Sequence, residues 1–284
     1  MKSALLKFGL SPTNGIYMSE LYNSQFYTAI KNDGIASAKL VIPFLIEIFD
    51  PKTLLDVGTG SGAWAWTAKN HGIKSLGIDG GYVPLKSRLL EPEEFIEEDL
   101  SAQWFEKIEA YGLFDITLCL EVAEHIPSTK AQHFIAQLIK TSNVIVFSAA
   151  IPYQGGTHHV NENWIKFWDS HFEQHDFIRL DLFRSKFWNS GEINFWYRQN
   201  LFLYVKKSLS ERYIKYEVKL PDDIIHPDLY LWSVKRKALD SNYEFDKEYR
   251  ESLLDQNSVN STPPNYGAEF DSAHKFFWKF FTKK

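Results

Sequence analysis

Short apolar runs alternate with longer amphipathic stretches along residues 53–174. The short runs are rich in Val, Ile, Leu and Phe and predict strands, whereas the stretches between them predict helices. Strands are expected at 53–57, 74–79, 94–98, 114–120 and 143–149, and helices at 61–70, 101–110, 128–141 and 161–174. This alternation predicts an α/β fold in which a parallel sheet carries helices on both faces.

Two further apolar runs, Phe177–Phe183 and Phe195–Val205, follow without a helical pattern between them. We expect them to pair as a closing antiparallel hairpin. Ahead of the first strand, residues 1–19 look irregular, and residues from about Glu20 to Asp50 read as mainly helical. Pro43 is expected to start, kink or interrupt that helix. Its apolar face holds Leu40, Val41, Phe44, Leu45 and Ile48.

The pattern divides the chain into an N-terminal helical segment at 1–50, a domain at 51–207 and a C-terminal extension at 208–284. Within the extension, residues 257–267 are rich in Asn, Ser, Pro and Gly and read as a linker. Residues 275–284 combine Lys and Phe at helical spacing. That end is expected to dock onto this or another protomer, or to contact a membrane surface weakly.

Composition narrows the possible partners. The chain has 284 residues and a net charge of −5, so no basic field favours nucleic acid as a partner. Cys119 is the single cysteine, which excludes an intrachain disulfide. The first ten residues are too short and polar for a signal peptide, and no apolar run reaches membrane-spanning length. The expected location is therefore the cytoplasm.

The segment Leu54–Gly62 predicts a nucleotide-like cofactor. It reads as a strand, a glycine-rich turn and the start of a helix, where glycines let a ligand approach the backbone. The pattern of Gly58, Gly60 and Ala63 also fits a dinucleotide fingerprint, so the neighbouring residues must distinguish between the two kinds of cofactor. Asp56 precedes the turn and would repel a pyrophosphate but attract an ammonium or sulfonium group.

Two later acids extend this pattern. Asp79 ends the second predicted strand about 20 residues after the turn and suits a ribose diol. Asp99, followed by Leu100, ends the third predicted strand and suits an adenine amino group. Because strands of a parallel sheet end at one edge, Asp56, Asp79 and Asp99 are expected to meet there.

In this order and spacing, the residues resemble class I S-adenosylmethionine (SAM)-dependent methyltransferases over roughly Thr53–Lys207. The resemblance implies a Rossmann-like fold with a mostly parallel seven-stranded sheet and a closing antiparallel hairpin. It further implies SAM as cofactor, with residues 1–50 as a lid over it. The residues implied to bind the cofactor are Asp56, Gly58, Gly60, Asp79, Asp99, Leu100 and Glu121.

A cluster of carboxylates and imidazoles follows the fourth predicted strand. Glu121 and Glu124 are three residues apart and His125 adjoins the second, so one helical turn lets them converge. The loop after the fifth strand opens onto the same crevice and carries His158 and His159. Such a set can hold a divalent ion. Alternatively, Glu124 and His125 cap the following helix and the histidines shape a loop.

Glu121-x-x-Glu124-His125 resembles the motif of metal-dependent O-methyltransferases, such as those of ubiquinone biosynthesis and small-RNA 3′-end methylation. The resemblance implies Mg, Mn, Fe or Zn held by Glu121, Glu124, His125 and His159, with His158 as the rival of His159. A metal there would lower the pKa of an acceptor hydroxyl. Without metal, His125 or His159 is the candidate general base.

Three blocks resemble a bacterial branch of methyltransferases associated with glycan and capsule gene clusters: Phe147–Pro152, Gly155–Thr157 with His159–Glu162, and Phe195–Asn200. The chain departs from that branch at Tyr153, where the branch more often has glycine. This branch does not identify the acceptor. O-methylation of a small-molecule or carbohydrate acceptor by direct displacement is favoured instead because a metal, His125 or His159 could promote loss of a hydroxyl proton. A catalytically silent SAM-binding scaffold subunit is the alternative, and Asp56 disfavours an NAD-dependent oxidoreductase.

The acceptor side offers two interpretations. Aromatic residues crowd the C-terminal part of the domain, where plain packing is the first interpretation and a flat wall for a sugar ring is the second. These are Trp164, Phe167, Trp168, Phe172, Phe187, Trp188, Trp196 and Tyr197. Arg184, Arg198, Gln199 and Asn200 are candidates for orienting the acceptor, although Arg198 also reads as a surface charge.

Overall fold

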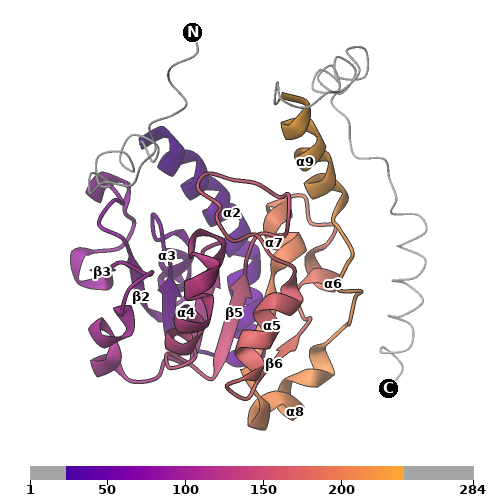
Figure 1. The fold of residues 1–284 in the computed structure, drawn as a ribbon. Helices are drawn as coiled ribbons and strands as arrows, with labels where there is room; N and C mark the ends of the chain where they lie inside the picture. The colour runs from indigo at the N-terminus through magenta and orange to yellow at the C-terminus, as the bar shows by residue number, and fades with distance from the viewer. Residues whose placement is uncertain (1–23, 240–284) are drawn as a thin grey trace. The chain divides into compact units, whose positions relative to one another are not determined.

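The computed structural model describes residues 24–239, with side chains described from residue 32 to residue 236. Its centre is a seven-stranded sheet (Figure 1). The strands are β1 (Thr53–Val57), β2 (Lys74–Asp79), β3 (Phe95–Glu97), β4 (Ile116–Leu120), β5 (Val144–Ser148), β6 (Phe177–Leu180) and β7 (Phe202–Lys206). Their order is β3-β2-β1-β4-β5-β7-β6. β1 to β5 run parallel, and β7 is antiparallel to β5 and β6, which confirms the predicted sheet.

Helices and short turns connect the strands. The helices are α2 (Ser24–Phe49), α3 (Ala63–Asn70), α4 (Ala131–Leu138), α5 (Ile165–Glu173), α6 (Arg184–Phe187), α7 (Phe195–Asn200), α8 (Ser210–Tyr213) and α9 (Pro227–Leu239). Single 3-10 turns lie at Leu85–Ser87, Pro92–Glu94, Trp104–Lys107, Glu109–Tyr111, Ala123–His125, Ser128–Lys130, Lys207–Leu209 and Ile214–Tyr216.

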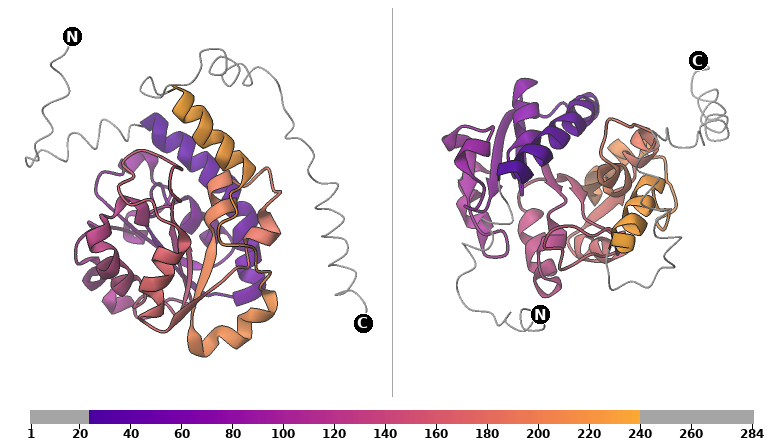
Figure 2. Two further views of the ribbon diagram at one scale, coloured as in Figure 1. Left: turned by 45° about the vertical axis from the view of Figure 1, so that its right-hand side comes forward. Right: turned by 90° about the horizontal axis from the view of Figure 1, so that it is seen from above.

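The sheet separates two hydrophobic cores. Leu54 of β1 packs into one core with α2 and α3, whereas the next residue, Leu55, packs into the other core with α4 and α5. Successive side chains of a strand point to opposite faces, so each strand contributes to both cores. The two sets of helices accordingly cover opposite faces of the sheet (Figures 1 and 2), as the strand–helix alternation predicts.

The long helix α2 confirms the predicted apolar face. Val41, Leu45 and Ile48 are buried, and the two other predicted residues, Leu40 and Phe44, pack against the same core. The helix runs through Pro43, which is exposed, so the expectation that Pro43 starts or interrupts it is wrong. A proline removes one backbone hydrogen bond within a helix. The apolar packing on the opposite face is what holds the two halves in one helix.

Two predicted elements differ from the structure. The helix expected at 101–110 is replaced by two 3-10 turns, in which Trp104 is fully buried. The second hairpin run is only half strand, because α7 occupies its first six residues. The expectation that no helix lies between the two runs is wrong, since α6 forms there. Asn194 precedes α7 in an extended conformation, and its carbonyl accepts from the amides of Tyr197 and Arg198. That helical turn buries Tyr197, so burial of an aromatic ring overrides the strand-like composition.

By compactness, the chain divides into two units, residues 1–230 and residues 231–284. In the first unit, the start of the extension is tied to the domain by Arg184, whose guanidinium donates to the carbonyls of Leu220 and Pro221. The second unit is described only through the end of α9, and the segment 275–284 lies outside the described residues. The described helices include none with the length and apolar character needed to cross a bilayer.

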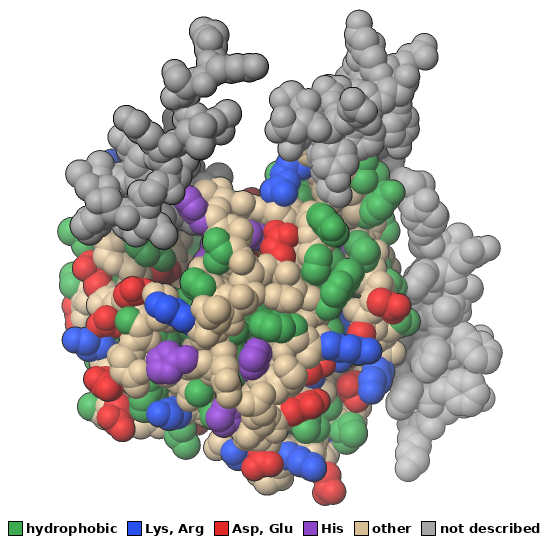
Figure 3. Space-filling model, viewed as in Figure 1, with side chains coloured by type: hydrophobic (Ala, Val, Ile, Leu, Met, Phe, Trp, Pro, Cys, Tyr) green, Lys and Arg blue, Asp and Glu red, His purple; other side chains and the backbone are tan. Residues whose placement is uncertain are grey.

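On the face shown in Figure 3, Lys and Arg side chains of the described residues are interspersed with Asp and Glu side chains. Neither sign of charge gathers into one continuous surface on that face.

Candidate functional site

Three acidic residues lie where the first three strands end. Asp56 is the fourth residue of β1, Asp79 is the last residue of β2, and Asp99 lies two residues beyond β3. In the parallel register, Asp56 pairs with Gly77 of β2 and with Leu118 of β4, so these strand ends are adjacent. Ligands of open α/β sheets bind beyond the carboxyl ends of the strands.

The turn after β1 needs glycine at two positions for different reasons. Gly58 and Gly60 have φ angles of 77° and 54°, a region that L-residues rarely adopt. A Cβ on Gly58 would lie 2.2 Å from the side chain of Val122, whereas a Cβ on Gly60 would meet no atom within 4 Å. Gly58 therefore serves packing, and the space beside the Gly60 α-carbon is open.

Asp56 is buried and has one side-chain partner, the Thr59 hydroxyl, which donates to it over 2.7 Å. Burial raises the pKa of Asp56 to about 7, because the ionised form loses its hydration. The described residues offer Asp56 no Lys or Arg partner. A ligand with positive charge would supply the missing compensation.

Asp79 is also buried but is surrounded by donors. The amide of Gly60 donates to one oxygen over 2.7 Å, and the amide of Gly80 and the hydroxyl of Tyr82 donate to the other, each over 2.7 Å. Burial raises the pKa of Asp79, and these hydrogen bonds partly oppose that rise. The carboxylate thus ties the glycine turn after β1 to the end of β2.

Asp99 and Leu100, the residues predicted to contact adenine, differ in exposure. Asp99 is exposed, and one of its oxygens accepts from the amide of Ser101 over 2.8 Å. Leu100 is 8% exposed and belongs to the core on the α4 and α5 face. The Asp99 carboxylate keeps free lone pairs toward solvent, and the Leu100 side chain mainly serves packing.

Glu121, directly after β4, adopts a φ of 54°, and its amide donates to the Ser148 carbonyl at the end of β5. Its carboxylate accepts from Gln154 over 2.7 Å and from Asn200 over 3.1 Å. Burial raises the pKa of Glu121. Strained backbone of this kind clusters at functional sites. The two amides hold the carboxylate between the loop after β5 and the end of α7.

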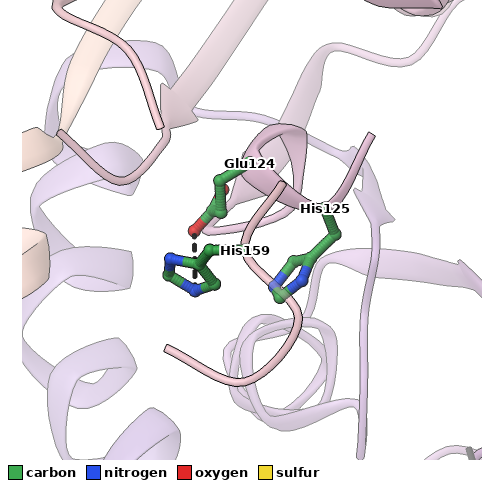
Figure 4. Close-up of side chains that lie close together, drawn as sticks. All are labelled: Glu124, His125 and His159. Carbon is green, nitrogen blue, oxygen red and sulfur yellow. Dashed lines mark ion pairs between the residues drawn. The ribbon is translucent and has the colours of Figure 1, made fainter. Parts of the chain in front are cut away.

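Glu124, His125 and His159 form the densest group of possible metal ligands among the described residues (Figure 4). One ligand atom from each lies within 4.8 Å of the others. Glu124 and His125 come from the 3-10 turn after β4, and His159 comes from the loop after β5. Glu121 lies outside this group, with its oxygens held by Gln154 and Asn200.

Glu124 is fully buried, and neither of its carboxylate oxygens has a hydrogen-bond partner among the described residues. Nε2 of His159 lies 4.0 Å from Oε1 of Glu124. Burial and the neighbouring Glu121 carboxylate raise the pKa of Glu124 well above its ordinary range. A buried carboxyl without partners costs stability and calls for an explanation, of which a bound ion is one.

The two histidines are oriented by the loop after β5. Nδ1 of His159 lies 2.8 Å from Oε1 of Glu162, and Nδ1 of His125 lies 3.2 Å from the carbonyl oxygen of His158. Their rings meet edge to face with centroids 4.9 Å apart. Burial lowers the pKa of His125 to about 4, so His125 is neutral at physiological pH, as metal ligation requires.

The main chain of this loop is anchored at both ends of the cluster. The carbonyl of Glu124 accepts from the amides of Val160 and Asn161. Glu162 accepts from the amides of Tyr153 and Gly155. His158 has a φ of 60° and an exposed side chain, so only its carbonyl faces the cluster. His159, rather than His158, therefore shares the cluster.

Several further predictions concern the acceptor side. Trp168, Phe172, Phe187 and Tyr197 are buried in the two cores, as the packing interpretation predicts, whereas Trp164 is 43% exposed. Arg184 and Arg198 are both buried. Arg184 pairs with Asp181 and Arg198 with Asp228, each over 2.6 Å, so the surface-charge interpretation of Arg198 is wrong.

Sequence reasoning missed Gln154 and Tyr82. Gln154 is a buried amide just beyond the apolar run after β5, and that isolated polar position was the available signal. Tyr82 follows Gly80 and Gly81 after β2, and its contact with Asp79 depends on how that turn folds back. The residue types of this turn do not specify that fold, so the contact could not be predicted from the sequence.

No family model matches the chain. Over 101 residues, 34% of this chain, it is 34% identical to the ubiquinone biosynthesis O-methyltransferase of Salmonella arizonae, of which the match covers 42%. A Salmonella paratyphi A protein of the same name is 33% identical over 104 residues. The chain thus spans about two-fifths of the length of the curated relatives it matches.

Among solved structures, the Synechocystis magnesium protoporphyrin IX methyltransferase with bound SAM has a TM-score of 0.47 and 15% identity, covering 70% of this chain and 99% of that one. The human N-acetylserotonin methyltransferase in complex with SAM has a TM-score of 0.44 and 15% identity, covering 70% and 61% respectively.

Proposed function

We propose that this chain is a SAM-dependent methyltransferase that transfers a methyl group to a hydroxyl oxygen of a small-molecule or carbohydrate acceptor. The observation that carries the proposal is the buried Asp56 at the end of β1, beside an open glycine turn and without a basic partner among the described residues. The O-methyltransferase relatives support the same reaction class.

The electrostatics of the crevice favour SAM over a dinucleotide. Asp56, Glu121 and Glu124 place three carboxyl groups around it, and the described residues pair none of them with Lys or Arg. SAM carries an ammonium and a sulfonium group, which opposite charges attract, whereas a pyrophosphate would be repelled. Asp79 then takes the ribose diol, and Asp99 is proposed to receive the adenine amino group.

A divalent cation is proposed as a second resident group. The two partnerless oxygens of Glu124 and the imidazoles of His125 and His159 form a mixed carboxylate and nitrogen donor set. Imidazole suits Zn and Fe, and carboxylate suits Mn, so Zn, Fe or Mn fits this mixed set. Glu121 is proposed on the cofactor side, since Gln154 and Asn200 already bind its oxygens. When bound, the ion would acidify an acceptor hydroxyl.

The chain itself would contribute placement and proton removal. The bond between the methyl carbon and the sulfonium sulfur would break as the methyl carbon bonds to the acceptor oxygen. The acceptor proton would pass to a base, and the products would be the methylated acceptor and S-adenosylhomocysteine. Alignment of this kind contributes on the order of 7–11 kcal/mol in well-oriented systems. When no metal occupies Nε2, His159 is the better candidate base, because Glu162 holds its Nδ1 and leaves Nε2 as acceptor. The low pKa of His125 makes it a weak base.

The test is formation of S-adenosylhomocysteine from SAM in the presence of hydroxylated acceptors, with and without a chelator. Nucleotide sugars come first in the panel, followed by small phenols and alcohols. We expect acceptor-dependent product with the wild type and none with Asp56→Asn. Binding of SAM without product from any acceptor would contradict transfer and favour a silent SAM-binding subunit.

A further inference from the structure

Tyr82 occupies a position on Asp79 that the proposed function assigns to a ligand. Its hydroxyl donates to Oδ1 of Asp79 over 2.7 Å, and the amide of Gly80 donates to the same oxygen. The other oxygen accepts from Gly60. A carboxylate offers about four acceptor positions, so these three donors leave one for a diol that brings two donors.

The Tyr82 ring packs against the turn that follows β2. The Tyr82 ring lies over Gly80, where a Cβ would be 2.0 Å from the ring carbon Cε1. Only glycine at position 80 admits this placement. The ring is 41% exposed, so it reaches solvent on one side while its hydroxyl reaches the buried carboxylate on the other.

The backbone beside Tyr82 is held in place. Val83 is 1% exposed, and its carbonyl accepts two bonds from the Arg88 guanidinium, which also pairs with Glu97 over 2.6 Å. The amide of Val83 donates to the Gly80 carbonyl over 3.3 Å. The turn that carries Tyr82 is therefore held by contacts that do not involve the Tyr82 hydroxyl.

We propose that Tyr82 is a specificity-determining residue whose hydroxyl stands on Asp79 in place of a ribose hydroxyl and is displaced by nucleosides that carry a vicinal diol. This inference rests on the proposed function, in which Asp79 binds the ribose. A ligand with the diol replaces the lost hydrogen bond with its own. A ligand without the diol cannot replace it and leaves Tyr82 in place.

The consequence is a ligand-dependent effect of removing the Tyr82 hydroxyl. In Tyr82→Phe, a diol ligand no longer displaces a hydrogen bond, so its affinity should rise by roughly threefold to tenfold, the range that the net free energy of one hydrogen bond spans. A ligand that makes no contact with Asp79 should bind the wild type and the variant equally.

The experiment compares S-adenosylhomocysteine, adenosine and 2′,3′-dideoxyadenosine by calorimetry or ligand-observed NMR on the full chain. Tyr82→Phe should bind the first two more tightly than the wild type and bind dideoxyadenosine unchanged. Tyr111→Phe removes a hydroxyl from a tyrosine that is 53% exposed and precedes β4, whereas Tyr82 follows the carboxyl end of β2, so it should change none of the three.

Three outcomes separate this inference from the proposed function. Equal or weaker binding of the diol ligands by Tyr82→Phe overturns the inference while the proposed function stands. The same gain for adenosine and dideoxyadenosine also overturns it, because the effect would then be steric rather than a matter of the diol. Failure of all three ligands to bind either protein overturns the inference and the proposed function together.

Discussion

His159 and Glu162 are joined over 2.8 Å between Nδ1 and Oε1, and this contact decides which ring nitrogen faces Glu124. Because the carboxylate accepts the Nδ1 proton, the lone pair of His159 lies on Nε2, the atom 4.0 Å from the Glu124 carboxylate. Carboxylate–histidine pairs orient metal-binding imidazoles in this way.

Glu162→Gln should therefore weaken the binding of Co²⁺ or Mn²⁺ to the protein by roughly 10- to 100-fold, the usual effect of losing such a partner. The fold should persist, since the amide can keep one of the loop contacts. Glu173→Gln, an exposed change at the end of α5, is the matched control. Unchanged metal affinity in a folded Glu162→Gln protein would show that Glu162 only shapes the loop.

SAM affinity should depend on pH through Asp56. Burial raises its pKa from 3.8 to about 7, and only the ionised form attracts a cation. Binding should therefore strengthen as pH rises from about 6 to about 8, by up to about tenfold per unit below the pKa. Titrations of Asp56→Asn at the same pH values should be weak and flat. A slope that survives in the variant would assign the titration to another group.

Glu124 should make the metal-free protein less stable at higher pH. Its folded pKa lies well above the unfolded value of about 4.5, so the folded state binds the proton more tightly. The contribution of Glu124 to the free energy of unfolding is therefore fully present below about pH 4.5 and is lost as the pH rises through the folded pKa. Urea unfolding at pH 5 and pH 8 should show this fall, and Glu124→Gln should reduce it. An equal fall in the variant would exclude Glu124 as its source.

The two turn glycines should respond differently to alanine. Gly58→Ala drives a Cβ into Val122 and should lower the unfolding free energy by several kcal/mol, because strain and overpacking add. Gly60→Ala meets open space and should cost only about 1–2 kcal/mol of backbone strain. Thermal melts compare the stabilities of the two variants. Gly60→Ala should remain folded in the melts, and calorimetric titration should find that it binds SAM more weakly than the wild type. Full SAM affinity in Gly60→Ala would place the ligand elsewhere.

The strands and their terminal acids were predictable because charge at the end of an apolar run is a local signal. Asp56 and Asp79 are where that signal indicates, and β1 to β5 follow the apolar runs. Convergence of Glu124, His125 and His159 was also predictable, since parallel strands bring the loops after β4 and β5 to one edge.

Other features depended on tertiary packing. The helix α7 forms where composition favours a strand, because one turn of helix buries Tyr197. The separation of Glu121 from the group of Glu124, His125 and His159 required knowing that Asn200, 79 residues later in the chain, would donate to Glu121. Residue spacing alone gives Glu121 and Glu124 the same role, and only their partners distinguish them.

Binding of SAM beyond β1 should depend on Asp56, and calorimetric titration of SAM and NAD into the wild type and Asp56→Asn measures that dependence. We expect micromolar binding of SAM by the wild type, much weaker binding by the variant, and no binding of NAD by either. Binding of NAD in preference to SAM, or SAM binding that is unchanged in Asp56→Asn, would contradict this expectation.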